Sequence, residues 1–294
     1  DIYALNVNTY FELGKLVNVP VLTKSKRPSH LNILVKNRYG LKNFYKILSD
    51  AHTTHFNRDA VVYKSVLDTY REGLLVGSGC ANGDIFTTAY EKSYDELLEK
   101  VSYYDFLEVQ PPECYYWLFE DLEEDKRDKI IQDIICRIIK AGKEKGVLVV
   151  ATGDVHQLVK EDSKYRQIYL SVQRPNGGGP HVLSRHKPLN MHFRSTTEML
   201  EEFDFLPAEI AHEIIVTNTN IIADMIEEFD IFPKKLFVPR DDYLSYMGVP
   251  SMEKALIETS NKTLKSMYGD NPPKYVQDRL DIELEKIIGN GYAS

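Results

Sequence analysis

Short apolar runs alternate with amphipathic segments along the first half of the chain, and this alternation most limits the folds available to it. Each run is rich in Val, Leu or Ile and is bounded by Gly or Pro, a pattern that predicts a buried strand. The predicted strands are 30–36, 73–79, 104–109 and 147–151. The predicted helices between them are 41–51, 61–70, 93–101 and 130–145. Strands that alternate with helices predict an α/β domain with mainly parallel strands.

In the second half of the chain, the apolar residues recur mainly at helical spacing. We expect helices over 162–172, 196–203, 207–228, 252–268 and 272–288. In the third of these helices we expect an interruption near Thr217 and Asn218. An extended connector with prolines at both ends, 233–250, predicts a boundary between the α/β domain and a helical segment.

Size and composition are those of a globular protein. The chain has 294 residues, 43% of them hydrophobic and 27% charged, with a net charge of −8. No run approaches the roughly 18 apolar residues of a membrane helix, and no secretory signal is recognisable, so we expect no membrane partner. Three cysteines in no zinc-finger spacing favour a reducing cytoplasm. The acidic balance argues against a nucleic-acid surface spread over the whole segment.

Two side chains able to bind a metal follow the last predicted strand. Asp154 and His156 lie two residues apart, so on extended backbone they point to the same side. Functional residues of open α/β sheets gather at the carboxyl ends of strands. The pair therefore favours a metal site, and the alternative is that both residues cap the helix that follows.

Other strand termini carry further candidates. His30 begins the first predicted strand and Cys80 follows the second, and with Asp154 and His156 these donors suit zinc or a similar divalent metal. Cys80 is also compatible with a small buried apolar residue, and His30 with an ordinary surface or core histidine. Glu108, inside its strand, is either a further candidate or faces solvent.

A glycine-rich loop, 176–179, lies in the second half. It lacks the phosphate-loop pattern, and no predicted strand leads into it, so a mobile loop is favoured. Four basic residues flank it and form the one local cluster suited to a phosphate backbone, with a solvated loop as the alternative. They are Arg174, Arg185, Lys187 and Arg194.

Six motifs in a fixed order connect the chain to a known family. They are Gly73–Cys80, Tyr104–Val109, Ala151–His156, His192–Leu200, Glu213–Asn220 and Leu284–Tyr292. Together they closely resemble the PolC-type DNA polymerase III alpha subunit, the replicative polymerase of low-GC Gram-positive bacteria and mollicutes. The resemblance runs from about residue 28 to the end.

The resemblance implies a particular layout. Family members carry a PHP (polymerase and histidinol phosphatase) domain split by an inserted 3′–5′ exonuclease, followed by the polymerase core. We therefore expect residues 1–29 to end the preceding linker or insertion. Residues 30–240 would be the later part of the PHP domain, a partial (β/α) barrel of mainly parallel strands. Residues 241–294 would begin the α-helical polymerase core. The chain starts without Met and stops after a helical segment, so we expect it to be a piece of a longer protein.

Site and partners follow from the same resemblance. The four residues carried over as PHP metal ligands are His30, Cys80, Asp154 and His156, with zinc or manganese as the expected ion. The earlier PHP ligands, the exonuclease carboxylates and the polymerase aspartates are missing, so the segment is expected to hold no catalytic residue and at most half of a metal site. The intact cytoplasmic protein would be a DNA-directed DNA polymerase with an exonuclease. Its implied partners are primer-template DNA, dNTPs with magnesium, a sliding clamp and other replisome subunits.

Two other functions stay open at this stage. PHP relatives hydrolyse phosphate esters with a metal-activated water, so a metal-dependent phosphoesterase is the main alternative. A structural module with an empty site is the third. The positions of the four candidate side chains discriminate between these functions, because metal ligands must converge on one point.

Overall fold

The computed structural model describes residues 5–10, 29–57, 59–172, 179–232, 234–235, 245–246 and 248–293. The chain divides into two compact units, 1–231 and 232–294. Among the described helices, none is both long enough and apolar enough to span a membrane.

A six-stranded sheet forms the centre of the first unit, in the order β5-β1-β2-β6-β7-β8. Its strands are β1 (Leu5–Tyr10), β2 (Ser29–Val35), β5 (Val62–Tyr63), β6 (Leu74–Gly77), β7 (Phe106–Val109) and β8 (Leu148–Ala151). Three of the five pairings are parallel, β1 with β5, β6 with β7 and β7 with β8. The α/β class with mostly parallel strands is therefore confirmed, and the described sheet is open, with β5 and β8 at its edges. A two-stranded hairpin stands apart, β3 (Phe56–Asn57) with β4 (Asp59–Ala60).

Alternating side chains bury both faces of this sheet. In β6, Val76 belongs to the larger core, whereas Leu75 belongs to a smaller cluster on the opposite face. In β8 the same alternation separates Val149 from Val150. Successive residues of a strand point to opposite faces, so two-sided burial explains the continuous apolar runs in the sequence.

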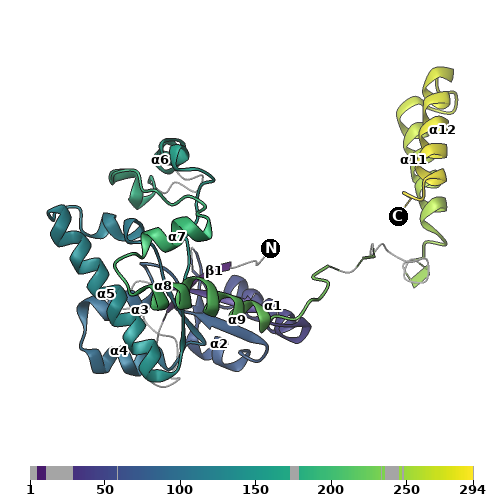
Figure 1. Ribbon diagram of the computed structural model, residues 1–294. Helices are drawn as coiled ribbons and strands as arrows, with labels where there is room; N and C mark the ends of the chain where they lie inside the picture. Colours follow the sequence, from purple (N-terminus) through teal and green to yellow (C-terminus); the bar gives the residue numbers. More distant parts are fainter. Residues whose placement is uncertain are drawn as a thin grey trace. The chain divides into compact units, whose positions relative to one another are not determined.

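The helices that follow the strands cover the larger core (Figure 1). They are α1 (Arg38–Thr53), α2 (Lys64–Thr69), α3 (Asp84–Glu91), α4 (Tyr94–Val101) and α5 (Glu124–Lys145), with a 3-10 turn, η1 (Pro112–Leu118). Helix α4 begins with a capping box, in which the Ser93 hydroxyl accepts from the Glu96 N–H and the Glu96 carboxylate accepts from the Ser93 N–H. Helix α5 ends at Gly146, whose φ of 68° places it in the left-handed region. Helix α3 and strand β1 were not among the predicted elements.

The rest of the first unit consists of short helices. They are η2 (Lys160–Asp162), α6 (Ser163–Ser171), η3 (Val182–Arg185), α7 (Thr196–Glu202), α8 (Ala208–His212), the π-helical turn η4 (Glu213–Thr217) and α9 (Asn218–Asp224). The chain stays helical where the interruption was predicted, near Thr217 and Asn218. There the helix widens into the π-helical turn η4 and then continues as α9. Ile222 of α9 joins the smaller cluster on the second face of the sheet.

The second unit contains the two helices that the sequence placed there. Helix α11 spans Met252–Tyr268 and α12 spans Lys274–Gly289, and the two pack against each other. Neither helix has a fully buried residue, and exposed ion pairs such as Arg279 with Glu283 lie along the surface.

Candidate functional site

His30 and Cys80 lie together because β2 runs antiparallel to β6. This direction brings the start of β2 to the edge where β6 ends, and the His30 N–H donates to the Asn82 carbonyl at 3.0 Å. The Cys80 Sγ lies 3.5 Å from the His30 Nδ1. Burial raises the pKa of Cys80 to about 11 and lowers the pKa of His30, so the pair is a neutral thiol and a neutral imidazole near pH 7.

Asp154 and His156 form a second pair beyond the end of β8. The Asp154 backbone has a φ of 43°, the one positive value for a residue other than glycine in the described part of the chain. The His156 Nδ1 lies 2.8 Å from the Asp154 carbonyl oxygen and 3.7 Å from its carboxylate Oδ1. A carbonyl oxygen can only accept, so Nδ1 carries the proton and the lone pair of the neutral ring resides on Nε2.

Electrostatics couple the two pairs. Burial raises the pKa of Asp154, and its electrostatic interactions with His156, Arg166 and His30, in that order, oppose the rise. The Asp154 carboxylate in turn adds to the rise in the pKa of Cys80, after burial. Even so, no three His, Cys, Asp or Glu side chains of the described residues are grouped closely enough to hold a metal ion. The four candidates thus lie as two neighbouring pairs and do not form a closed ligand set.

Glu108 lies buried at this edge, so the alternative that it faces solvent is wrong. Its carboxylate accepts hydrogen bonds from the Asn32 amide at 2.7 and 2.9 Å. The Gly79 N–H donates to it at 3.1 Å and the Thr152 hydroxyl at 3.2 Å. Burial raises the pKa of Glu108, and these donors, led by Asn32, oppose the rise. The carboxylate therefore ties β2, the Cys80 loop and the end of β8 to β7.

The hydrogen-bonded network extends beyond Glu108 into the core. The Gln110 amide donates to the Thr152 hydroxyl at 2.9 Å, and the fully buried Tyr115 hydroxyl donates to the Gln110 side-chain oxygen. The Gln110 N–H donates back to the Tyr115 hydroxyl at 2.9 Å. Sequence reasoning missed these residues, although polar residues within buried strand runs were a signal for them.

The loop that positions Cys80 requires glycine at position 79. The φ of Gly79 is 72°, and a Cβ atom there would lie 2.9 Å from the His30 carbonyl oxygen. Glycine is the residue that accepts both conditions without strain. The resulting turn aims the Gly79 N–H at Glu108 and carries Cys80 toward His30.

The predicted basic cluster is only partly a surface feature. Arg194 is buried, and its guanidinium donates to Glu202 at 2.7 Å and to the Asn190 carbonyl at 2.7 Å. It also lies 3.5 Å from the Glu113 carboxylate. The expectation that Arg194 could touch a phosphate backbone is therefore wrong, because its donors are engaged inside the fold. Arg185 and Lys187 are exposed, and Arg174 and most of the glycine loop lie outside the described residues.

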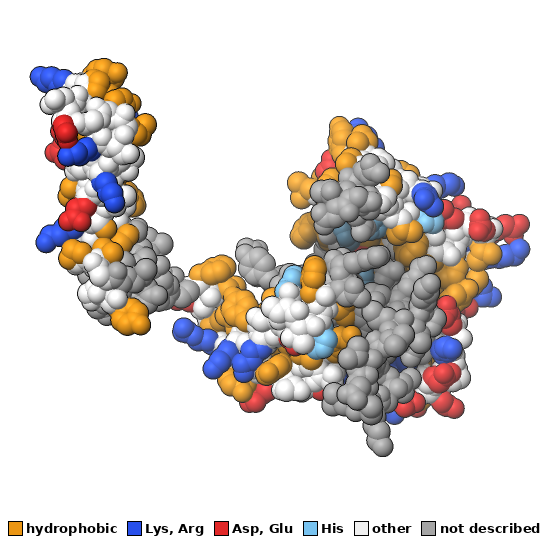
Figure 2. Space-filling model, turned by 180° about the vertical axis from the view of Figure 1, so that it is seen from behind, with side chains coloured by type: hydrophobic (Ala, Val, Ile, Leu, Met, Phe, Trp, Pro, Cys, Tyr) orange, Lys and Arg blue, Asp and Glu red, His pale blue; other side chains and the backbone are white. Residues whose placement is uncertain are grey.

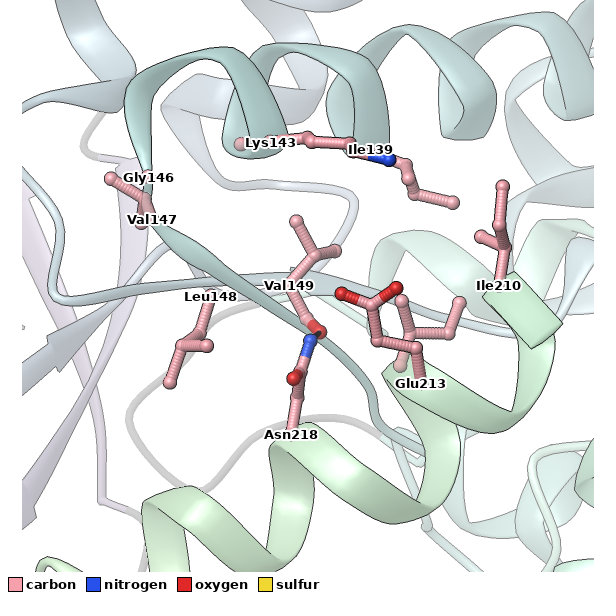
Figure 3. Close-up of a pocket in the computed structure, with 11 residues that line it drawn as sticks. Ile139, Lys143, Gly146, Val147, Leu148, Val149, Ile210, Glu213 and Asn218 are labelled. Carbon is pink, nitrogen blue, oxygen red and sulfur yellow. Dashed lines mark hydrogen bonds between the residues drawn. The ribbon is translucent and has the colours of Figure 1, made fainter.

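A cavity of about 240 Å³ lies at the other end of β8 from Asp154, between α5 and the π-helical turn. Figure 3 shows Ile139 and Lys143 of α5 opposite Val149 and Glu213 across this space. The Asn218 amide, on its floor, donates to the Val149 carbonyl at 2.8 Å. None of the four candidate ligands lines this cavity.

The chain is similar to known proteins over most of its length. A model of the PHP domain matches residues 5–110. The DNA polymerase III PolC-type of Bacillus subtilis (strain 168) is 40% identical over 267 residues, covering 91% of this chain and 18% of that protein. That of Halalkalibacterium halodurans is 41% identical over 268 residues, with coverages of 91% and 18%. That of Staphylococcus epidermidis (strain ATCC 12228) is 38% identical over 289 residues, with coverages of 98% and 19%.

The chain thus spans less than a fifth of the length of these curated relatives. The matched PHP region contains His30 and Cys80 and stops before Asp154 and His156. The expected domain limits, 1–29, 30–240 and 241–294, stay predictions, and strand β1 lies within the first of them.

Proposed function

We propose that this chain, which belongs to the PolC type of DNA polymerase III as a segment containing a PHP domain, acts as a scaffold within a replicative polymerase and contributes part of a metal site. The similarity to PolC-type polymerases over at least 91% of the chain supports the first part of the proposal. In the intact protein the activity would be template-directed nucleotide addition with magnesium, accompanied by 3′–5′ exonuclease activity. DNA, dNTPs, a sliding clamp and other replisome subunits would be its cytoplasmic partners.

The scaffold role rests on the polar network at the carboxyl edge of the sheet. A buried carboxylate with four donor contacts from three residues fixes the relative positions of β2, β7 and β8. Such a network is costly to disrupt, because each partner left behind would be a buried polar group without a hydrogen bond. No catalytic residue is assigned to this segment.

The metal part of the proposal rests on the spacing of the first pair. Zinc bonds of about 2.3 Å to sulfur and about 2.0–2.1 Å to nitrogen, at a tetrahedral angle, separate the two ligand atoms by about 3.5 Å. The Cys80 Sγ and His30 Nδ1 lie 3.5 Å apart, and the His156 Nε2 is available on the neighbouring pair. Because the described residues form no closed set, the four side chains would be a share of a site, and further donors would complete it.

Thermal melting with and without metal tests whether these four side chains contribute to a metal site. At zinc about 100-fold above its dissociation constant, a site of this kind raises the melting temperature by about 5–10 °C. His156→Ala and Asp154→Asn should each reduce that shift, and His212→Ala, at an exposed histidine far along the chain in α8, is the matched control. The same series should be repeated with manganese.

The outcomes separate the candidate functions. Equal melting temperatures in zinc and in chelator would remove the metal share and leave the scaffold alone. A metal-dependent phosphoesterase is the second candidate, favoured by the PHP match and the four donor side chains. Metal-dependent hydrolysis of a phosphomonoester by the wild type, lost in His156→Ala, would favour it over the scaffold.

A further inference from the structure

A small lobe beside the candidate site carries a surface that the proposed function does not use. This α6 lobe comprises residues 155–172 and 179–194 and is built from η2, α6 and η3. The Gln167 amide on α6 donates to the carbonyls of Ser184 at 2.8 Å and His186 at 3.1 Å. The Phe193 N–H donates to the Gln157 carbonyl at 3.0 Å. These bonds hold the surface residues of the lobe in fixed positions.

Large apolar side chains of the lobe face solvent. Tyr165, Ile168 and Tyr169 of α6, with Val172 directly after its end, recur at the spacing of one helix face, and all four are exposed. The two tyrosines are 60% and 77% exposed, and Phe193 is 65% exposed. Figure 2 shows hydrophobic side chains gathered over this upper lobe. Exposed apolar clusters of this density mark interaction surfaces.

Cations are interleaved with these rings. The described residues of the lobe include six Lys and Arg against two Asp and Glu, in a chain whose net charge is −8. Lys160, Lys164, Arg185 and Lys187 are exposed, and none of the four has an ion-pair partner in the part of the chain that the structure describes. The Lys164 Nζ stands 4.8 Å from the centre of the Tyr165 ring.

We infer that the α6 lobe binds single-stranded nucleic acid, with bases stacked on Tyr165 and Tyr169 and phosphates held by the neighbouring lysines. Single-strand binding surfaces combine exposed aromatic rings with cations that follow the backbone, and stacking tolerates any base. The inference goes beyond the scaffold role and does not depend on a bound metal. It is also compatible with the acidic composition of the chain, because within the described residues of this lobe Lys and Arg outnumber Asp and Glu by six to two.

An acidic protein partner is the competing occupant of the same surface. Ile168 and Val172 would serve such a partner as well as the tyrosines do, since an apolar interface requires only buried area. Nucleic acid requires the flat rings themselves. The substitution Tyr→Leu therefore discriminates the two, because it keeps the apolar surface and removes the face on which a base stacks.

The experiment measures fluorescence anisotropy of a labelled oligothymidylate of about 12 nucleotides titrated with the whole chain. The double variant Tyr165→Leu with Tyr169→Leu should weaken binding by about tenfold or more. Tyr275→Leu with Tyr292→Leu is the matched control, because these rings are 75% and 74% exposed in the second unit and should leave binding unchanged. Circular dichroism melts establish that both variants fold.

Salt dependence supplies the second readout. Lys160→Ala with Lys164→Ala should lower the slope of log K against log salt by about 1.4, which corresponds to two lost phosphate contacts on a single strand. Absence of binding by the wild type at low salt, or full binding by the α6 double variant, would overturn the inference. Full binding by this variant would show that the oligonucleotide does not stack on Tyr165 and Tyr169. The zinc melts are independent of this assay, so failure here leaves the proposed function as it stands.

Discussion

Two carboxylates at the same edge of the sheet have opposite surroundings. Glu108 is buried and accepts hydrogen bonds from Asn32, Gly79 and Thr152. Asp154 is also largely withdrawn from solvent, yet in the described residues its one ion-pair contact is His156, at 3.7 Å. Burial raises the pKa of both groups; hydrogen-bond donors oppose the rise at Glu108, whereas at Asp154 it is opposed by electrostatic interaction with nearby side chains, first of all His156.

This difference separates a structural role from a binding role. A carboxylate whose lone pairs are filled by the fold stabilises its surroundings and has little capacity left for a ligand. Asp154 combines open acceptor capacity with a strained backbone at a φ of 43°. Strain of this kind persists where the surrounding structure imposes it, and it clusters at functional sites.

The largest expected effect is the loss of Glu108. Glu108→Ala would leave the Asn32 amide and the Gly79 N–H buried without an acceptor, and we expect it to lower the free energy of unfolding by about 2–4 kcal/mol. Urea denaturation at pH 7 measures this loss. A change below about 0.5 kcal/mol would mean that the network does not stabilise the edge, and the comparison with Asp154 would fail.

A smaller effect is expected in the pH dependence of Glu108→Gln, which keeps the shape and one acceptor oxygen. Because the folded pKa of Glu108 is raised, the stability linked to its protonated form is present below the unfolded pKa of about 4.3 and is lost as pH rises through the folded pKa. The wild type should therefore become less stable relative to Glu108→Gln as pH increases from 4.5 to 7. Parallel urea titrations at several pH values measure the difference. A constant difference would show that Glu108 has an ordinary pKa.

The sequence predicted the elements that build this edge better than it predicted how they meet. Apolar runs located β2, β6, β7 and β8, because burial on both faces leaves a continuous signal. The same reasoning predicted mainly parallel strands, whereas β2 pairs antiparallel with β6, and this pairing places His30 beside Cys80. A local pattern does not specify the direction of a single strand. That direction depends on the connections between strands and on neighbouring strands such as β1, which was not predicted.

The candidate site shows the same limit. Spacing of two residues identified Asp154 and His156 as a pair, and the structure keeps them as neighbours. The partners of Glu108 were missed because Asn32 lies 76 positions away in the chain, and a hydrogen bond over that distance leaves no periodic trace. The role of Arg194 was wrongly predicted because the sequence does not show which charges pair: its guanidinium donates to Glu202 and also lies near Glu113, which becomes close only in the folded protein.

The smallest expected effect tests the strained carboxylate directly. Asp154→Gly relieves a positive φ that costs about 1–3 kcal/mol and removes a poorly solvated carboxylate, while the added backbone entropy of glycine costs about 0.5–1 kcal/mol. In chelator, we expect a net gain of about 1 kcal/mol in the free energy of unfolding, measured by urea denaturation. Zinc should stabilise the same variant less than it stabilises the wild type, because one ligand is lost. A loss comparable to that of Glu108→Ala in chelator would show that Asp154 supports the fold, and the contrast between the two carboxylates would then be one of degree.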